Sequence, residues 1–299
     1  MNLASSTMDV GHRVTSSAGY GAHRARKPAF YLVTAAFLAF LVFALRDTMA
    51  MVVNAWFAGY AFPDHRVHHV MIGGTLAVFV ATVAIQLYRP SKRVGALQAA
   101  IAFVIAAFAL TILASGPAAA GEILVFVVPV LLIAALHPAR RQLVPSLERV
   151  DVRLLALAAV GAIGFGTVAV GEYAAHTTLG NEHVVFGHYE FMLIALASIG
   201  LFAILGALRP IGWRALVYGA GALAILFAVG SLAFPGIEQG SSLGPIAALA
   251  VIAWAVAFVG LAEYTRGADA ESSPRDTDTD PSRRESDRET SQSGARQVS

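Results

Sequence analysis

Long apolar runs alternate with short polar segments along most of the chain. A window of about 19 residues, which crosses roughly 30 Å of hydrocarbon at about 1.5 Å per residue, finds eight such runs. They are centred on residues 29–50, 70–88, 94–114, 123–136, 154–172, 191–208, 216–234 and 245–262. The fourth run is the shortest and fits a re-entrant or buried helix as well as a membrane span. The pattern predicts an all-α integral membrane protein with about eight transmembrane helices.

Composition and charge support this class of protein. Of the 299 residues, 57% are hydrophobic and 13% are charged, and the mean hydropathy is +0.66. These values lie outside the range of ordinary soluble domains, so we expect the lipid bilayer to be the main partner. The basic residues lie in short clusters between apolar runs and do not form one polar face. We therefore expect no nucleic-acid partner.

Lysine and arginine concentrate in alternate polar segments. Residues 1–28, 89–93, 138–153 and 209–214 are rich in them. The alternate connections, around residues 62–69, 115–122, 177–188 and 235–243, carry only Arg66. Because loops rich in Lys and Arg stay in the cytoplasm, we predict a multi-pass protein of the cell membrane with both termini cytoplasmic. The last residues mix charges of both signs with Ser, Thr and Pro, a composition typical of disorder.

The chain also matches itself at an offset of 120 residues. The coinciding positions are a histidine, an Arg-Pro pair and a glycine: His68 with His188, Arg89 and Pro90 with Arg209 and Pro210, and Gly116 with Gly236. The flanking hydropathy matches too, which predicts two tandem four-helix repeats. Because four is an even number, the repeats insert in parallel. The predicted organisation is a basic segment 1–28, repeats 29–137 and 152–264, a linker 138–151 and a disordered tail 265–299.

Arg46 and Asp47 interrupt the first apolar run. If the halves are equivalent, the first helix continues to about residue 53 and this charged pair lies below the outer surface of the membrane. Ionisable residues at that depth usually face a bundle interior or an aqueous cavity. The alternative is that the pair lies in the headgroup region, before an interfacial segment.

Histidines gather in the segments that are predicted to be outside. Three have the i, i+3, i+4 spacing that places side chains on one face of a helix, and a Glu and a His in the second half are i, i+4. The candidate metal ligands are His65, His68, His69, Glu172, His176 and His188. The chain has no cysteine, which excludes thiolate ligands and leaves Cu, Zn, Fe or a haem as candidate cofactors. The repeat relates His68 to His188, so these two are the preferred haem ligands.

Three classes of function follow from these features. A metal-handling or redox protein would use the histidine cluster. A permease would need broken or polar helices near the midplane, for which Pro129 and the Arg46 and Asp47 pair are candidates. A scaffold or sensor would use the histidines for pH sensing. No nucleotide-binding loop, zinc-protease helix or serine-hydrolase elbow occurs, so the sequence assigns no enzyme class.

Overall fold

The computed structural model describes residues 4–272, with side chains described for residues 25–236 and 238–265. This part of the chain is helical and contains no strand. The α-helices are α1 Ala4–Asn54, α2 Arg66–Ala84, α3 Val94–Ser115, α4 Pro117–Leu136, α5 Val152–Thr178, α6 Glu182–Val185, α7 His188–Ala207, α8 Arg214–Ala233 and α9 Pro245–Ser272. Short 3-10 helices are η1 Pro63–His65, η2 Ile85–Leu87, η3 Pro90–Lys92, η4 Arg140–Gln142 and η5 Ile237–Gln239. The predicted disordered tail, residues 265–299, was placed too early, because residues 265–272 belong to α9; the rest of it lies outside the described residues.

Eight of these helices are long and apolar enough to cross a membrane. They correspond to the eight predicted runs, so the prediction of an all-helical chain with eight long apolar helices is confirmed for the described residues. The uncertain fourth run becomes the 20-residue helix α4, because the helix begins at Pro117, ahead of the apolar run. Pro129 lies inside α4 without ending it.

The helix α1 continues through Arg46 and Asp47 and ends at Asn54, as the comparison of the two halves predicts. The Arg46 Nε and Asp47 Oδ1 atoms are 3.6 Å apart, and the two side chains are 64% and 91% exposed. The charged pair therefore does not face the interior of the bundle.

Four helices form the centre of the unit that extends to Gly260. In α2, α3, α7 and α8, the buried share of the most apolar window is 56, 50, 67 and 61%. In α1, α4, α5 and α9 it is 22, 22, 28 and 22%. Each group of four consecutive long helices thus has two exposed outer members and two buried inner members. From Leu261 the chain forms a second unit, which begins with the last turns of α9.

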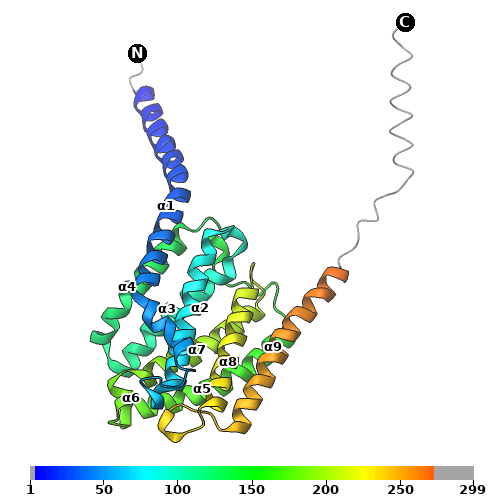
Figure 1. Ribbon diagram of the computed structural model, residues 1–299. Helices are drawn as coiled ribbons and strands as arrows, with labels where there is room; N and C mark the ends of the chain where they lie inside the picture. Colours follow the sequence, from blue (N-terminus) through cyan, green and yellow to red (C-terminus); the bar gives the residue numbers. More distant parts are fainter. Residues whose placement is uncertain (1–3, 273–299) are drawn as a thin grey trace, which may run out of the picture. The chain divides into compact units, whose positions relative to one another are not determined.

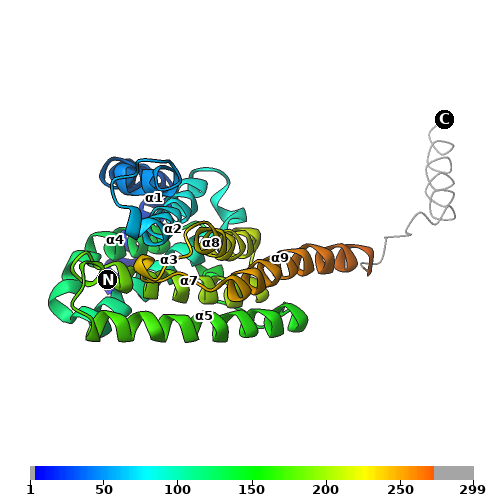
Figure 2. The ribbon, with the colours of Figure 1, turned by 60° about the horizontal axis from the view of Figure 1, so that its bottom comes forward.

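The inner helices pack crosswise between the two halves of the chain. The helix α2 contacts α8 and α7 contacts α3, while α1 packs on α2 and α5 packs on α7. Figure 1 shows α6 and the α1–α2 and α8–α9 connections at one end of the helices, which we call the α6 end. The α2–α3 and α4–α5 connections lie at the opposite end. Figure 2 shows α1 and α5 on opposite sides of the inner helices.

Two glycines let the halves meet at the opposite end. The Gly95 N–H donates to the Ile211 carbonyl oxygen at 2.8 Å. A Cβ on Gly95 would lie 2.8 Å from the Gly212 carbonyl oxygen, and a Cβ on Gly212 would lie 2.8 Å from the Lys92 oxygen. Gly212 also has a φ of +76°. The two backbones therefore approach closely only because neither residue has a side chain.

The two connections at this junction share an unusual backbone conformation. Arg89 and Arg209 are the non-glycine residues with positive φ in the described chain, at 50° and 52°. Each precedes a proline, Pro90 or Pro210, and a residue before proline normally adopts an extended conformation. The same strained turn thus occurs twice, 120 residues apart.

The close approach at Gly95 predicts that two Gly→Ala substitutions change the stability differently. We expect Gly95→Ala to lower the stability by about 1–3 kcal/mol, because its Cβ meets backbone atoms that cannot rotate away. We expect Gly121→Ala, within α4, to leave stability unchanged or raise it by up to about 1 kcal/mol, because nothing lies within 4 Å of that Cβ. Thermal unfolding of both variants in the same detergent checks this. Equal melting temperatures would contradict the close contact.

Candidate functional site

Five histidines from three segments converge at the α6 end. His65 is the last residue of η1, and His68 and His69 lie in the first turn of α2. His183 lies in α6, and His188 is the first residue of α7. None of the five is more than 7% exposed. Buried polar groups need partners, so the arrangement of their ring nitrogens determines what the cluster can do.

Local sequence signals explain why these segments turn toward one another. Pro63 begins η1, and proline favours the first position of a helix. The Asn181 side chain accepts a hydrogen bond from the Val184 N–H and caps α6. Gly187 joins α6 to α7 with a φ of +69°, a conformation that glycine adopts at little cost. The short helix α6 therefore folds back and brings His183 beside the start of α7.

Three of the histidines have the spacing of metal ligands. The Nδ1 atoms of His65 and His188 are 3.0 Å apart, and those of His183 and His188 are 3.4 Å apart. One ligand nitrogen of each of the three lies within 4.8 Å of the other two. Two nitrogens bound to one tetrahedral ion at about 2.0–2.1 Å lie roughly 3.4 Å apart. The three rings therefore need little movement to share an ion.

The outer nitrogens of two of these rings face acceptors. The Nε2 atom of His183 is 2.9 Å from the Glu238 carbonyl oxygen, which only accepts hydrogen bonds. His183 Nε2 thus carries the proton, and its Nδ1 has a free lone pair. The Nε2 atom of His65 is 3.7 Å from the Glu182 carboxylate. Burial lowers the pKa of His183 by more than the hydrogen bond to the Glu238 carbonyl raises it, which favours the neutral ring that metals bind.

The third ring is continued by a chain of polar groups. The Nε2 atom of His188 is 3.3 Å from His69 Nε2, and His69 Nδ1 is 2.5 Å from the Tyr60 hydroxyl. Burial raises the pKa of Tyr60 by more than the positive charge of Arg66 lowers it, so the phenol stays neutral. If His188 donates to His69 and His69 donates to Tyr60, the Nδ1 atom of His188 is also free to bind an ion.

His68 has a buried nitrogen without a partner. Its Nε2 is 2.6 Å from Ser241 Oγ, and that hydroxyl is 2.6 Å from Glu172 Oε2. Ser241 has one proton, so when it donates to Glu172 it accepts from His68 Nε2. The Nδ1 atom of His68 then carries a lone pair, and it has no hydrogen bond within the described residues. The His68 ring lies 4.7 Å and 5.0 Å from the rings of His183 and His188, measured between centroids.

The loop before α9 covers the cluster closely. Gly240 has a φ of +77°, and a Cβ there would lie 2.8 Å from His68 Cε1 and 3.2 Å from the Tyr189 hydroxyl. A glycine is therefore required both by the backbone conformation and by the space.

The structure brings together four of the six predicted metal ligands, namely His65, His68, His69 and His188. Glu172 reaches the cluster only through Ser241. His176 lies apart, with its Nε2 3.1 Å from Ser115 Oγ and 3.9 Å from Glu190 Oε2. His176 thus belongs to a separate polar group on α3, α5 and α7.

The predicted haem ligands have an unsuitable orientation. The His68 and His188 rings are inclined by only 22°, with centroids 5.0 Å apart. Axial ligands approach a haem iron from opposite faces, whereas these rings lie face to face. His183 and Ser241 were not among the predicted ligands. The N-cap signature at Asn181, which predicts a short helix before His188, is the sequence signal that points to His183.

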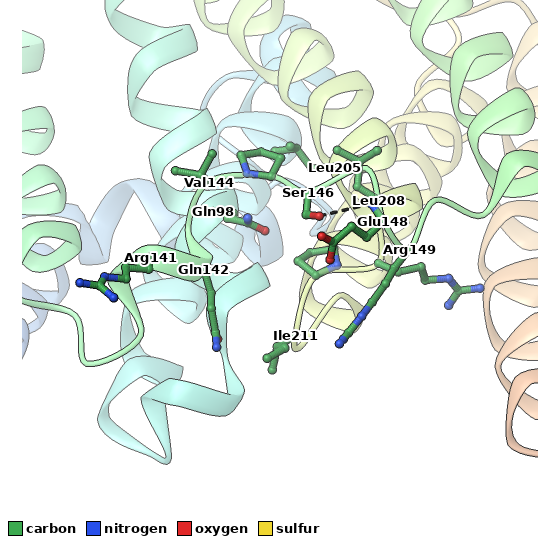
Figure 3. A pocket seen from close by; sticks show the side chains of 13 residues that line it. Gln98, Arg141, Gln142, Val144, Ser146, Glu148, Arg149, Leu205, Leu208 and Ile211 are labelled. Carbon is green, nitrogen blue, oxygen red and sulfur yellow. Dashed lines mark hydrogen bonds between the residues drawn. The ribbon is translucent and has the colours of Figure 1, made fainter. Parts of the chain in front are cut away.

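A hollow of about 260 Å³ lies at the opposite end of the helices (Figure 3). Figure 3 shows Arg141 and Gln142 on one side and Glu148 and Arg149 on the other. These side chains are exposed and carry both charges. The wall also includes Gln98, which is 4% exposed, but it contains no histidine, so the hollow has no ligand cluster like that at the α6 end.

Comparison of the chain with known protein families, with curated proteins and with solved structures found no match. The chemistry of the histidine cluster therefore carries the functional assignment.

The close contact between Gly240 and His68 predicts the effect of adding one methyl group at position 240. We expect Gly240→Ala to displace the His68 ring and lower stability by about 1–3 kcal/mol, because of the contact and the positive φ. Gly180→Ala is the matched loop control, since nothing lies within 4 Å of its Cβ. Thermal unfolding and nitrogen-15 spectra of labelled histidines measure the two effects. Unchanged histidine resonances in Gly240→Ala would disprove the close cover.

Proposed function

We propose that this chain is a polytopic integral membrane protein that binds a transition-metal ion at the buried histidine cluster on its outer face. The outward faces of the peripheral helices support insertion in a bilayer. They carry large apolar side chains that are each more than half exposed, namely Leu32, Phe43, Val160, Ile163, Leu249 and Val256. Water disfavours so much exposed apolar surface, whereas lipid tails are equally apolar.

We also propose that the chain consists of two tandem parallel repeats of four helices. Three observations support this. The order of outer and inner helices is the same in both halves. The packing of α2 on α8 is matched by that of α7 on α3. The strained Arg-Pro turn recurs at Arg89 and Arg209, and His68 and His188 meet across the boundary between the halves.

The distribution of positive charge supports the proposed orientation. The Lys- and Arg-rich connections lie at the end opposite α6, so the positive-inside rule assigns the α6 end to the outside of the cell membrane. Both termini are then cytoplasmic.

The orientation can be tested with single cysteines, because the chain has none of its own. We expect a membrane-impermeant maleimide to label Gly180→Cys in intact cells. We expect it to label Ser146→Cys only after permeabilisation. Both positions are exposed, so access across the membrane alone distinguishes them. The reverse pattern would invert the topology, and labelling of both in intact cells would argue against insertion.

One observation carries the metal site: the Nδ1 atoms of His65, His183 and His188 converge while each Nε2 faces another polar group. Metal-binding histidines almost always donate their second ring N–H to such an outer partner, which fixes the tautomer and the ring orientation. Histidines that merely fill a core have no reason to share this arrangement. The free Nδ1 of His68 supplies a candidate fourth ligand.

The ligand set favours Zn²⁺ or Cu²⁺. Neutral imidazole suits both ions, and three or four nitrogens match the tetrahedral preference of zinc. The stacked rings of His68 and His188 favour a metal ion over a haem. The permease alternative has less support, because Pro129 leaves α4 unbroken and the Arg46 and Asp47 side chains are exposed.

Metal titration of chelator-stripped protein tests the proposal. We expect one Zn²⁺ or Cu²⁺ per chain, measured by mass spectrometry, and a tetrahedral absorption spectrum with Co²⁺. We expect His65→Ala, His183→Ala and His188→Ala each to lower the affinity by at least about 100-fold, since loss of an outer partner alone costs about 10–100-fold. Glu182→Ala removes the carboxylate that faces His65 Nε2, and we expect its effect to fall in that smaller range.

The control is His176→Ala, because His176 lies at the same end and outside the cluster. It should bind metal like the wild type. A wild-type protein that takes up no ion, or ligand variants that bind as tightly as His176→Ala, would refute the metal site.

A further inference from the structure

An apolar hollow of about 400 Å³ borders the histidine cluster. Its walls come from α1, α2, α7 and the connections before α2 and α7. The lining includes Met51, Phe62, His65, His69, Phe186 and His188. This volume falls within the range of small-molecule sites, which is about 300–1,000 Å³.

The hollow adjoins a further apolar space. A second space of about 190 Å³ shares Leu76, Gly187 and Phe191 with it. That space extends along α3 and α4, where Phe103 and Phe126 line it. An occupant of the first hollow therefore has room for an apolar extension.

Aromatic rings dominate the wall of the first hollow. Phe62, Phe186 and Phe191 line it together with three of the histidines. Phe62 and Phe186 are 48% and 60% exposed, and both pack edge-on against His65, at centroid distances of 6.3 and 5.9 Å. They lie on two different connections, so they form the rim of the hollow.

The wall offers few free polar groups. The ring nitrogens of His65, His69 and His188 already face one another, Glu182 or Tyr60. An occupant therefore meets ring faces and edges instead of unpaired donors. Such a wall favours a flat apolar ring, which packs against aromatic side chains in stacked or edge-on geometry.

We infer that the hollow binds a lipid-soluble planar ring compound, placed against the ligands of the metal ion. The inference rests on the proposed function, because the bilayer delivers the compound and His65 and His188 are the proposed metal ligands. Metal and ring compound then occupy adjoining sites.

The test uses 2-methyl-1,4-naphthoquinone as the probe and the full chain in lipid nanodiscs. Equilibrium dialysis measures probe binding, with empty nanodiscs subtracted, and zinc content is measured on the same samples. We expect one saturable site in the wild type. Met51→Trp fills the hollow from α1 and should weaken binding about ten-fold or more, because the indole ring takes up space that the probe needs. Leu32→Trp, on the exposed face of α1, should bind like the wild type.

A second readout locates the probe. With Cu²⁺ in place of Zn²⁺, the proton relaxation of bound naphthoquinone should accelerate, and this effect should disappear in Met51→Trp.

Absence of saturable binding, or equal affinity in Met51→Trp, would overturn the inference, as would a phospholipid that occupies the hollow and excludes the probe. If the protein binds zinc but not the probe, only the ring-compound site is refuted. If it binds the probe saturably but no zinc, the metal site is refuted and the ring-compound site is supported.

Discussion

The approach of His65 to His188, with Nδ1 atoms 3.0 Å apart, constrains much of the structure around it. Both side chains are buried, so each nitrogen needs a hydrogen, a lone pair or an ion opposite it. The ends of α2 and α7 must therefore meet, and the connections on either side must supply outer partners. Glu182, Glu238 and His69 occupy these positions. An unsatisfied member of such a buried network is costly, and the Nδ1 atom of His68 is such a member.

The sequence was sufficient to predict the fold at the level of its elements. Runs of apolar residues predict helices strongly because each run must hide its backbone polar groups. The boundaries were less accurate. The helix α2 begins at Arg66, four residues before the predicted run, because histidines lower the local hydropathy without opposing a helix. The exposed position of Arg46 and Asp47 depends on how α1 rotates against its neighbours, and hydropathy carries no information on that rotation.

The candidate site was predicted only in part, for a related reason. Spacing places His65, His68 and His69 near one another on a single element, so local geometry sufficed there. The pairing of His68 with His188 followed from the offset between the halves. The position of His183 depends on how α6 folds back toward α7. The position of Ser241 depends on the α8–α9 connection, which passes over the cluster. Such long-range contacts are set by packing, and no spacing within one segment reveals them.

An ion at this cluster would be a removable cross-link within the chain. His65 and His188 are 123 positions apart, so coordination would close a loop that contains most of the first half. Closing long loops restricts the unfolded chain most, and binding energy at such a point is also folding energy. The availability of metal outside the cell would then set how firmly the first four long helices stay docked on the second four.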